Sequence, residues 1–256
     1  MAQLEIELVP CLSDNYAYLV RDPDEDFCAI VDPSEARPVK AALDARGWRL
    51  THILNTHHHP DHTGGNPALK AEYGAKVIGP EKDRARIPAL DEGVVEGSHF
   101  ALGSHHARVL EIPAHTRAHI AFAFEEDEAV FTGDTLFAMG CGRLFEGTPE
   151  MMWRSLSKLM TLPESVRVYC GHEYTLNNGR FALTLEPGNI DLEARMRDVE
   201  ALRASGSPTI PSTIGLEKRT NPFLRPQSPE IRRTLNMPGA SDVAVFAEIR
   251  ARKDKY

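Results

Sequence analysis

The chain has 256 residues, enough for one large domain or two unequal domains with a buried core. Its 37 acidic residues outnumber the 29 basic ones, and the formal net charge of -8 argues against a nucleic-acid partner, which would favour a basic surface. The four cysteines are far apart and form no C-x-x-C pair, so neither a zinc ribbon nor a redox dithiol is indicated.

The N-terminus and the hydropathy predict a cytoplasmic protein. Residues 1–11 contain glutamates and no basic side chain, so they do not resemble a secretory signal. No apolar run approaches the roughly 20 residues that a membrane-spanning helix needs. Sparse cysteines suit the reducing cytosol. We therefore expect a cytoplasmic protein that has neither a membrane nor a nucleic-acid partner. We also expect a monomer.

The first part of the chain predicts alternating strands and helices. The β-α-β-α-β order favours a sheet with helices packed on its faces. Residues 80–106 are polar and predict irregular structure. Gly47 and Gly74 are expected to end the helices. The predicted strands cover residues 4–9, 16–20, 27–31, 53–56 and 76–78, and the helices cover residues 35–46 and 66–73.

The character of the chain changes near residue 172. Before it, the pattern predicts a strand at 107–112, a hairpin of 119–124 and 129–132, a helix at 149–161 with Thr148 as N-cap, and a strand at 166–170. After it, the pattern predicts helices at 175–186, 191–204, 229–235 and 241–252, with a long loop over 206–222. We predict a catalytic domain over 1–172 and a helical substrate-binding domain over 173–256.

One short stretch, Thr56-His57-His58-His59-Pro60-Asp61-His62-Thr63-Gly64-Gly65, is rich in metal-ligand types. Alternate side chains of an extended segment share a face, so His57 and His59 are expected to point the same way. The chain turns at Pro60, which lets Asp61 and His62 approach from another side. Imidazoles and a carboxylate at this spacing suit zinc, iron or manganese.

Further ligand types follow other predicted strands. His57, His115, Asp134 and His172 each come just after a short apolar strand. Ligand sites of sheet-and-helix folds collect at one set of strand ends, so we expect these residues to converge. Of the other histidines, His119 is the candidate for supporting a ligand through a second hydrogen bond.

These residues predict a centre with two divalent cations and one bridging carboxylate. We assign His57, His59 and His115 to the first cation. Asp61, His62 and His172 go to the second, and Asp134 bridges both. A water between two cations loses a proton near neutral pH and can attack a carbonyl carbon. We therefore predict Asp61 and Asp134 as the catalytic carboxylates. No G-x-S-x-G motif offers a serine nucleophile.

The ligand pattern His57-x-His59-x-Asp61-His62, with His115, Asp134 and His172, resembles the metallo-β-lactamase superfamily. Within it, the chain is similar to the hydroxyacylglutathione hydrolases, or glyoxalases II. That closer resemblance runs from end to end and rests on residues 13–16, 133–137, 140–148, 170–175, 186–189, 221–225 and 250–256.

The resemblance implies an α/β fold, an αββα sandwich of two mixed sheets followed by a helical domain. It implies hydrolysis of S-D-lactoylglutathione and other S-2-hydroxyacylglutathiones to D-lactate or its analogues and glutathione, the second step of methylglyoxal detoxification. Zinc is the expected metal, with iron or manganese as alternatives. The implied substrate-binding residues are Arg143, Phe145, His172, Tyr174, Arg250 and Lys253.

The chain departs from the family pattern at two places. Ala114 and Ala118 stand where the family usually has glycine around His115. Alanine restricts φ, so this turn must either avoid positive φ or bear strain. Arg143 and Phe145 stand where some relatives have Lys and Tyr. Phe145 lacks the hydroxyl donor of tyrosine, which bears on substrate affinity rather than on chemistry.

Two alternatives remain at this point. A persulfide dioxygenase of the same fold would use a single iron and would not need the basic C-terminal segment. A small-molecule-binding module would use the metals structurally, although closed structural zinc sites usually contain cysteine. β-Lactam hydrolysis is disfavoured because no export signal is visible, and a nuclease is disfavoured by the acidic charge balance.

Overall fold

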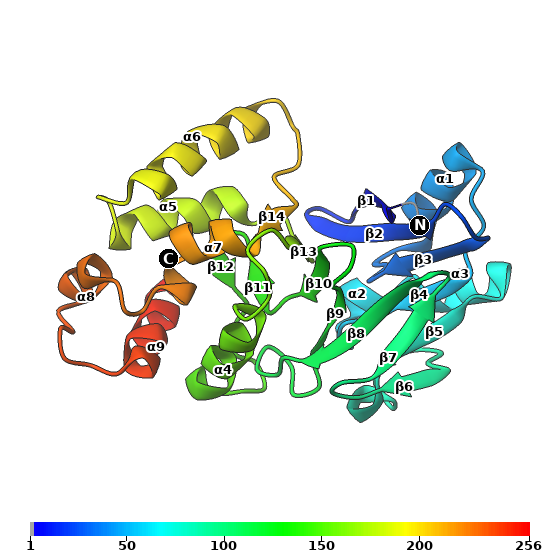
Figure 1. Cartoon of the computed structure of the whole chain (residues 1–256), viewed down its shortest axis with the longest axis horizontal. Coiled ribbons are helices and arrows are strands. Elements are labelled where there is room, and N and C mark those ends of the chain that lie inside the picture. The colour runs from blue at the N-terminus through cyan, green and yellow to red at the C-terminus, as the bar shows by residue number, and fades with distance from the viewer. Residues whose placement is uncertain (1–2) are drawn as a thin grey trace. The chain divides into compact units, whose positions relative to one another are not determined.

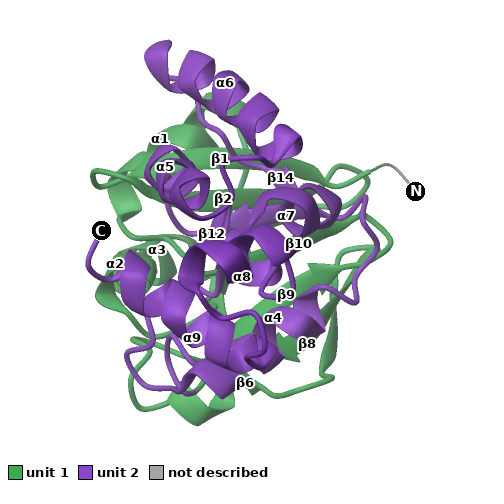
Figure 2. Cartoon of the chain, turned by 90° about the vertical axis from the view of Figure 1, so that its left-hand side faces the viewer, with its two compact units in different colours: residues 1–111, 118–133 green, residues 112–117, 134–256 purple. Residues whose placement is uncertain are grey.

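The computed structural model describes residues 3–256, which form two compact units (Figure 2). Unit 1 comprises residues 1–111 and 118–133, and unit 2 comprises residues 112–117 and 134–256. This division follows packing within the chain and does not coincide with the functional boundary expected near residue 172. That boundary stays a prediction.

The first sheet of unit 1 has six strands in chain order (Figure 1). Its first three strands are antiparallel, and the remaining ones join in parallel, so the sheet is mixed. Parallel neighbours need crossover connections, and helices supply two of them. The strands are β1 (Glu5–Cys11), β2 (Asn15–Asp22), β3 (Phe27–Val31), β4 (His52–Leu54), β5 (Lys76–Pro80) and β6 (Glu92–Val94).

The crossover helices α1 (Ala36–Arg46) and α3 (Asn66–Tyr73) cover one face of this sheet. Val39 and Leu43 of α1 and Leu69 of α3 are fully buried in a cluster with apolar side chains of β1 to β5. Each helix ends at a glycine in the left-handed region, Gly47 at φ 66° and Gly74 at φ 68°. The helices and their glycine ends are as predicted.

A second, antiparallel sheet in unit 1 contains strands in the order β10-β9-β8-β7. The rings of Tyr18 in β2 and Phe131 in β10 lie 5.6 Å apart between centroids, which shows that the two sheets pack face to face. The bounds are β7 (His99–Leu102), β8 (His105–Glu111), β9 (Ile120–Phe124) and β10 (Ala129–Gly133).

The prediction of irregular structure over residues 80–106 was wrong. The segment contains the 3-10 turn η1 (Glu81–Asp83), β6, β7 and the start of β8. β6 pairs in parallel with β5, with Ile78 opposite Glu92. Such pairing with a distant strand gives structure to a polar segment whose own periodicity does not indicate it.

Unit 2 is dominated by helices. The helices are α4 (Pro149–Leu159), α5 (Thr175–Leu185), α6 (Ile190–Ala204), α7 (Ile214–Thr220), α8 (Pro229–Leu235) and α9 (Asp242–Lys253). The Thr148 side chain caps α4 by accepting from the Met151 amide, as predicted. Helices α5 and α6 pack around a buried cluster that includes Ala182, Leu192 and Met196.

Short strands complete unit 2. They are β11 (Leu136–Phe137), β12 (Gly140–Cys141), β13 (Arg167–Cys170) and β14 (Ser212–Thr213). The long loop predicted over 206–222 was wrong, because this segment contains β14 and α7. Ser212 pairs with Val168 of β13, and the Thr213 side chain caps α7. The 3-10 turn η2 (Pro222–Leu224) follows α7 directly.

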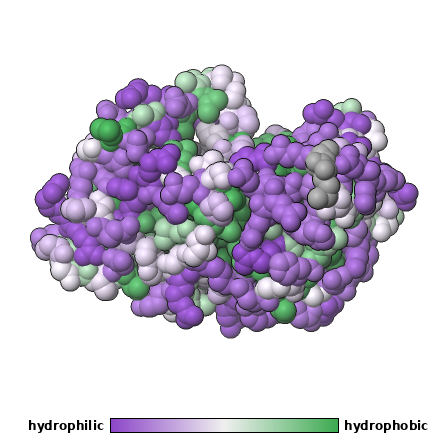
Figure 3. All heavy atoms as spheres, in the orientation of Figure 1, coloured by the Kyte–Doolittle hydropathy of each residue, from purple (hydrophilic) through white to green (hydrophobic). Residues whose placement is uncertain are grey.

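The surface is polar on the face drawn in Figure 3, where hydrophilic residues contribute most of the visible atoms. Over residues 3–256, the helices all fall short of the length and apolar character needed to cross a bilayer.

Candidate metal centre

Two of the candidate ligands meet directly after β4. His57 Nε2 and His59 Nδ1 lie 3.1 Å apart, so both nitrogens face one point, as the alternation of an extended segment predicts. The Thr56 hydroxyl contacts the other nitrogen of His57, Nδ1, at 3.0 Å. That contact leaves His57 Nε2 directed towards His59.

A short helix, α2 (Pro60–Thr63), carries the next two candidates in place of the simple turn that the sequence suggested. Pro60 occupies its first turn, where the missing amide proton costs nothing. His62 Nε2 lies 3.4 Å from Asp61 Oδ2. The amide of Asn15 donates to the same carboxylate oxygen at 3.0 Å and to the Asp61 carbonyl at 3.1 Å, which fixes the Asp61 side chain.

Asp32 is a site residue that the sequence analysis missed. Its Oδ1 accepts from the Thr56 amide at 2.8 Å, and its Oδ2 accepts from the Thr56 hydroxyl at 2.6 Å. The same Oδ2 lies 3.1 Å from His62 Nδ1. A buried carboxylate holds the imidazole proton on Nδ1, so the lone pair of Nε2 can bind a cation. The available signal was its position, since Asp32 directly follows β3.

His119 packs against the same group. Its ring stacks on that of His57 with centroids 4.6 Å apart and an interplanar angle of 19°. Gly133 makes room for it, since a Cβ at this position would lie 2.8 Å from His119 Cε1 and the backbone has φ +47°. His119 therefore supports His57 by packing, and its predicted second hydrogen bond stays a prediction.

Unit 2 brings the remaining three candidates together. Asp134 Oδ2 lies 3.4 Å from His115 Nε2 and 3.3 Å from His172 Nε2. All three side chains are buried. His115 Nδ1 donates to the carbonyl oxygen of Arg143 at 2.9 Å, which leaves the lone pair of the ring on Nε2. One carboxylate oxygen thus faces two imidazoles, and the bridging role of Asp134 stays a prediction.

These donor pairs fit divalent cations. Ligand atoms bonded at about 2.0–2.1 Å to one tetrahedral zinc lie about 3.3–3.4 Å from one another. The ligand pairs of both units lie 3.1 to 3.4 Å apart. The set contains imidazole nitrogens and carboxylate oxygens without thiolate, which suits zinc, iron or manganese. The convergence of the two groups at one centre stays a prediction.

The turn before His115 bears backbone strain. Ala114 is buried and has φ 145°, a region that alanine rarely adopts. Its amide donates to the Thr116 carbonyl at 3.0 Å. Gly147 lies against it so closely that a Cβ there would come 2.4 Å from Ala114 Cα. Of the two outcomes expected for alanine at this position, the turn therefore takes the strained one.

Two aromatic side chains of the predicted substrate set lie against ligands. The Tyr174 ring stacks on His172 with centroids 4.7 Å apart and an interplanar angle of 6°. The Phe145 ring lies 5.2 Å from that of His115 and is 62% exposed. Both rings therefore offer an apolar surface beside unit 2's ligands, and their contact with substrate stays a prediction.

The predicted cations of the substrate set lie close together in unit 2. Arg143 Nε lies 3.9 Å from Asp254 Oδ1, and Arg250 Nη2 lies 3.0 Å from the same oxygen. Arg250 is buried and also donates to the Cys141 carbonyl at 2.8 Å, so its guanidinium is engaged within the fold. Burial, with smaller contributions from Arg250 and Arg143, lowers the pKa of Lys253 to about 8.

The cysteines near this region are buried. Burial raises the pKa of the Cys141 thiol to about 11 and that of the Cys170 thiol to about 12. Thiols with such pKa values carry almost no thiolate at neutral pH. Both therefore fit the packing role expected from the sequence.

Comparison with known proteins gives two family matches. The family described as "Metallo-beta-lactamase superfamily" matches residues 13–172. The family described as "Hydroxyacylglutathione hydrolase C-terminus" matches residues 173–256. The hydroxyacylglutathione hydrolase of Methylococcus capsulatus is 57% identical over 253 residues, which is 99% of each chain. That of Rhodospirillum rubrum is 52% identical over 256 residues and covers 100% of each chain.

A solved structure supports the same fold. The crystal structure of TTHA1623 in a di-iron-bound form superposes with a TM-score of 0.62 at 26% identity, over 84% of this chain and 98% of that one. The predicted fold class, an α/β sandwich with a helical C-terminal region, is confirmed by this similarity and by the family matches. The chain belongs to the metallo-β-lactamase superfamily and, within it, to the hydroxyacylglutathione hydrolase family.

Proposed function

We propose that the chain hydrolyses S-D-lactoylglutathione and other S-2-hydroxyacylglutathiones to D-lactate or its analogues and glutathione, the second step of methylglyoxal detoxification. Its full-length relatives carry the name of this activity. The observation that carries the proposal is Asp134, whose Oδ2 faces His115 Nε2 and His172 Nε2 at 3.4 and 3.3 Å. A carboxylate oxygen placed between imidazoles suits a metal-dependent hydrolase.

We further propose that two divalent cations are bound, with zinc as the metal and iron or manganese as substitutes. His57, His59 and His115 would hold the first, and Asp61, His62 and His172 the second, with Asp134 shared. The donor types and the di-iron form of TTHA1623 support this assignment. When bound, such cations activate a water and polarise a carbonyl.

The chain's own groups prepare the ligands for that chemistry. Asp32 accepts the Nδ1 proton of His62, and the Arg143 carbonyl accepts the Nδ1 proton of His115. Each contact fixes a tautomer in which Nε2 is the ligand atom. The leaving group does not require a general acid, because a thiol with a pKa of about 8.5 departs as thiolate without obligatory protonation.

The substrate's glutathione part would be held in unit 2. Its carboxylates suit the cations Arg143 and Lys253, since Arg and Lys pair with such groups. Tyr174 would contact the glutathione part together with these cations, and Phe145 would contact the substrate without a hydroxyl to donate. Arg250 would act from within the fold through its contact with Asp254. On this proposal residues 1–172 form the catalytic domain, and residues 173–256 form the substrate-binding domain.

We also propose that the protein works as a monomer in the cytoplasm, on a small molecule rather than on nucleic acid or a membrane. Its four cysteines are free and buried, which suits a reducing compartment. Light scattering of the purified protein tests the monomer, for which the expected mass is 28.4 kDa.

The experiment for the proposed function compares two thioesters. Purified protein, with its metal content measured, is given S-D-lactoylglutathione and, in parallel, S-lactoyl-cysteamine, which lacks the peptide. We expect fast turnover of the first alone. Equal turnover of both would keep the thioesterase but remove the roles proposed for Arg143, Tyr174, Arg250 and Lys253. No turnover of either by metal-loaded protein would contradict the proposal.

A further inference from the structure

The β11–β12 hairpin connects several groups of the candidate centre. It begins just after Asp134 and leads to Arg143, whose carbonyl accepts from His115. The Gly142 amide closes this segment by donating to the Thr135 carbonyl at 3.2 Å. A shift of the hairpin would therefore move the bridging carboxylate and the group that orients His115.

The hairpin also contacts the aromatic stack. The ring of Phe137, on β11, lies 6.0 Å from that of His172 and 5.4 Å from that of Tyr174, edge-on to both. Its position therefore bears on a metal ligand and on a predicted substrate contact together.

The helical part of unit 2 holds the hairpin by its backbone. Met139, in the turn, has φ 54°, and its side chain is buried between α5 and α6. The Asn178 amide of α5 donates to the Ala138 carbonyl at 3.1 Å, and Arg250 of α9 donates to the Cys141 carbonyl at 2.8 Å. A turn in a strained region persists only where its surroundings fix it, as these contacts do.

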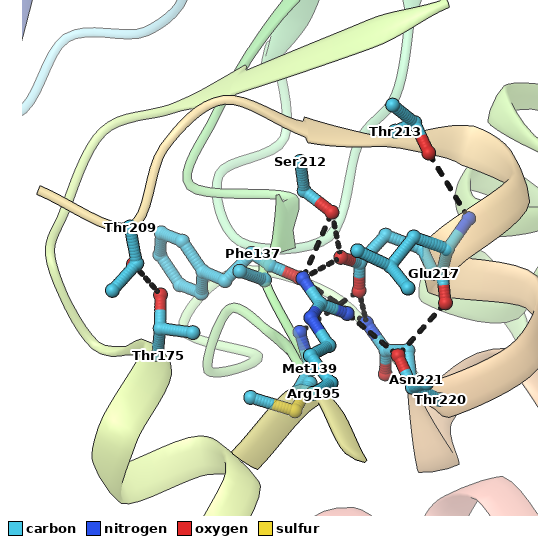
Figure 4. Close-up of polar contacts among 12 residues, drawn as sticks. Phe137, Met139, Thr175, Arg195, Thr209, Ser212, Thr213, Glu217, Thr220 and Asn221 are labelled. Carbon is cyan, nitrogen blue, oxygen red and sulfur yellow. Dashed lines mark hydrogen bonds and ion pairs between the residues drawn. The ribbon is translucent and has the colours of Figure 1, made fainter. Parts of the chain in front are cut away.

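Glu217 of α7 provides a further anchor (Figure 4). Its Oε2 accepts from the Met139 amide at 2.8 Å and from the Asn221 side-chain amide at 2.9 Å. The same nitrogen of Asn221 lies 3.1 Å from the Phe137 carbonyl and 3.0 Å from the Gly140 carbonyl. One carboxylate oxygen thus supports the turn directly and both strands through one amide.

The other oxygen of Glu217 faces a buried cation. Arg195 Nη2 donates to Glu217 Oε1 at 2.6 Å, and the Ser212 hydroxyl donates to the same oxygen. Arg195 Nη1 donates to Thr220 Oγ1 at 2.6 Å. Arg195 is 7% exposed and Glu217 is fully buried. A buried ion pair is often no more stabilising than apolar residues of similar size, so stability alone does not explain it.

We propose that Glu217 is a positioning residue for the thioester reaction, a role that rests on the proposed function. It acts through the Met139 amide and Asn221 on the β11–β12 hairpin. The hairpin in turn keeps Asp134 and Arg143 in register with the ligands of unit 2. Arg195 supplies the counter-charge that makes a buried carboxylate tolerable at this place.

The first test compares Glu217→Gln with Glu186→Gln. The glutamine side chain has a single acceptor oxygen, and Arg195 would attract that oxygen. The NH2 group of the glutamine would then face the Met139 amide, so two donors would meet and the hydrogen bond to Met139 would be lost. Glu186 is a matched control because it is also buried, and its Oε1 accepts from Arg225 Nη2 at 2.7 Å. In the described residues its side-chain hydrogen-bond partners are Arg225, Ser228 and Asn189, none of them in the hairpin.

Both variants are expected to lower the melting temperature. Only Glu217→Gln should speed amide hydrogen exchange across residues 136–141. Only this variant should also lower kcat/KM for S-D-lactoylglutathione, by about tenfold if one contact is lost. Equal changes in kcat/KM and in hairpin exchange for the two variants would overturn the proposal, since they would reflect general destabilisation.

The second test separates anchoring from charge neutralisation. Arg195→Met/Glu217→Gln is a neutral pair whose amide oxygen is free to accept from Met139. Arg195→Met/Glu217→Met is a neutral pair without any acceptor. We expect the first double variant to restore kcat/KM and hairpin exchange towards wild type. The second should keep a low kcat/KM and fast hairpin exchange although it folds stably. Equal restoration of activity and exchange by both double variants would show that Glu217 merely neutralises Arg195, and this result would refute the positioning role.

The exchange readout keeps the two proposals distinguishable. If the wild-type protein does not hydrolyse the thioester, the proposed function fails on that result alone. The anchoring is then decided by exchange: faster exchange in Glu217→Gln than in Glu186→Gln supports it, and unchanged exchange refutes it.

Discussion

Oδ2 of Asp32 lies 3.1 Å from Nδ1 of His62, and the same carboxylate accepts two hydrogen bonds from Thr56. The carboxylate is therefore held rigidly, and it fixes both the tautomer and the orientation of His62. Asp32 lies outside the candidate ligand set of the sequence, yet its position decides which nitrogen of His62 reaches a cation.

Replacing Asp32 with asparagine should weaken metal binding. The amide in Asp32→Asn cannot accept from Thr56 and from His62 as the carboxylate does. Loss of such an outer partner typically lowers metal affinity by about 10–100-fold. Competition with a chromophoric chelator measures the affinity. Asp44→Asn, on the exposed side of α1, is the control and should leave it unchanged. An unchanged affinity in Asp32→Asn would remove the role assigned to this contact.

Replacing Ala114 with glycine should stabilise the protein. The positive φ of Ala114 costs of order 1–3 kcal/mol, and glycine removes that cost while adding about 0.5–1 kcal/mol of chain entropy to the unfolded state. Denaturant unfolding should therefore show a net gain of about 1 kcal/mol. Ala118→Gly is the matched control, because Ala118 is not among the described residues with positive φ, and this variant should lose stability. A loss of stability in Ala114→Gly as well would contradict the backbone strain assigned to Ala114.

Lys253 should give the reaction a dependence on pH. Its pKa is lowered to about 8, so the ammonium that would pair with a substrate carboxylate is present below this pH and lost above it. We expect kcat/KM, which reports the ionisation of the free enzyme, to fall as the pH rises through about 8. The fall should result from a rise in KM.

The matched variants for that dependence are Lys253→Arg and Lys255→Arg. A guanidinium stays protonated over this range, so Lys253→Arg should remove the decline near pH 8. Lys255 is exposed, and its replacement should leave the decline in place. A decline that persists in Lys253→Arg would assign the titration to another group.

The sequence predicted those elements whose signals are local. Gly47 and Gly74 end helices because glycine adopts the left-handed conformation, and Thr148 caps α4 with its own hydroxyl. Spacing alone placed His57 and His59 on one face. The local candidates of the site were therefore visible before the fold was known.

The sequence failed where structure depends on distant partners. β6 forms against β5, and β14 forms against β13, although neither segment has a periodicity of its own. The roles of Asp32 and Glu217 were not predicted, because the sequence alone does not distinguish a buried carboxylate from an exposed one. The strain at Ala114 depends on the close approach of Gly147, which spacing does not reveal.

The most direct test of the central claim is metal analysis and thioester turnover of the wild-type protein beside Asp134→Asn. An asparagine offers one acceptor oxygen and no charge, so it cannot serve two cations as a carboxylate does. We predict about two metal ions per wild-type chain, with hydrolysis of S-D-lactoylglutathione, and loss of both metals and nearly all turnover in the variant. A variant that keeps its metal ions and its turnover would contradict the bridging role of Asp134 and, with it, the dinuclear centre.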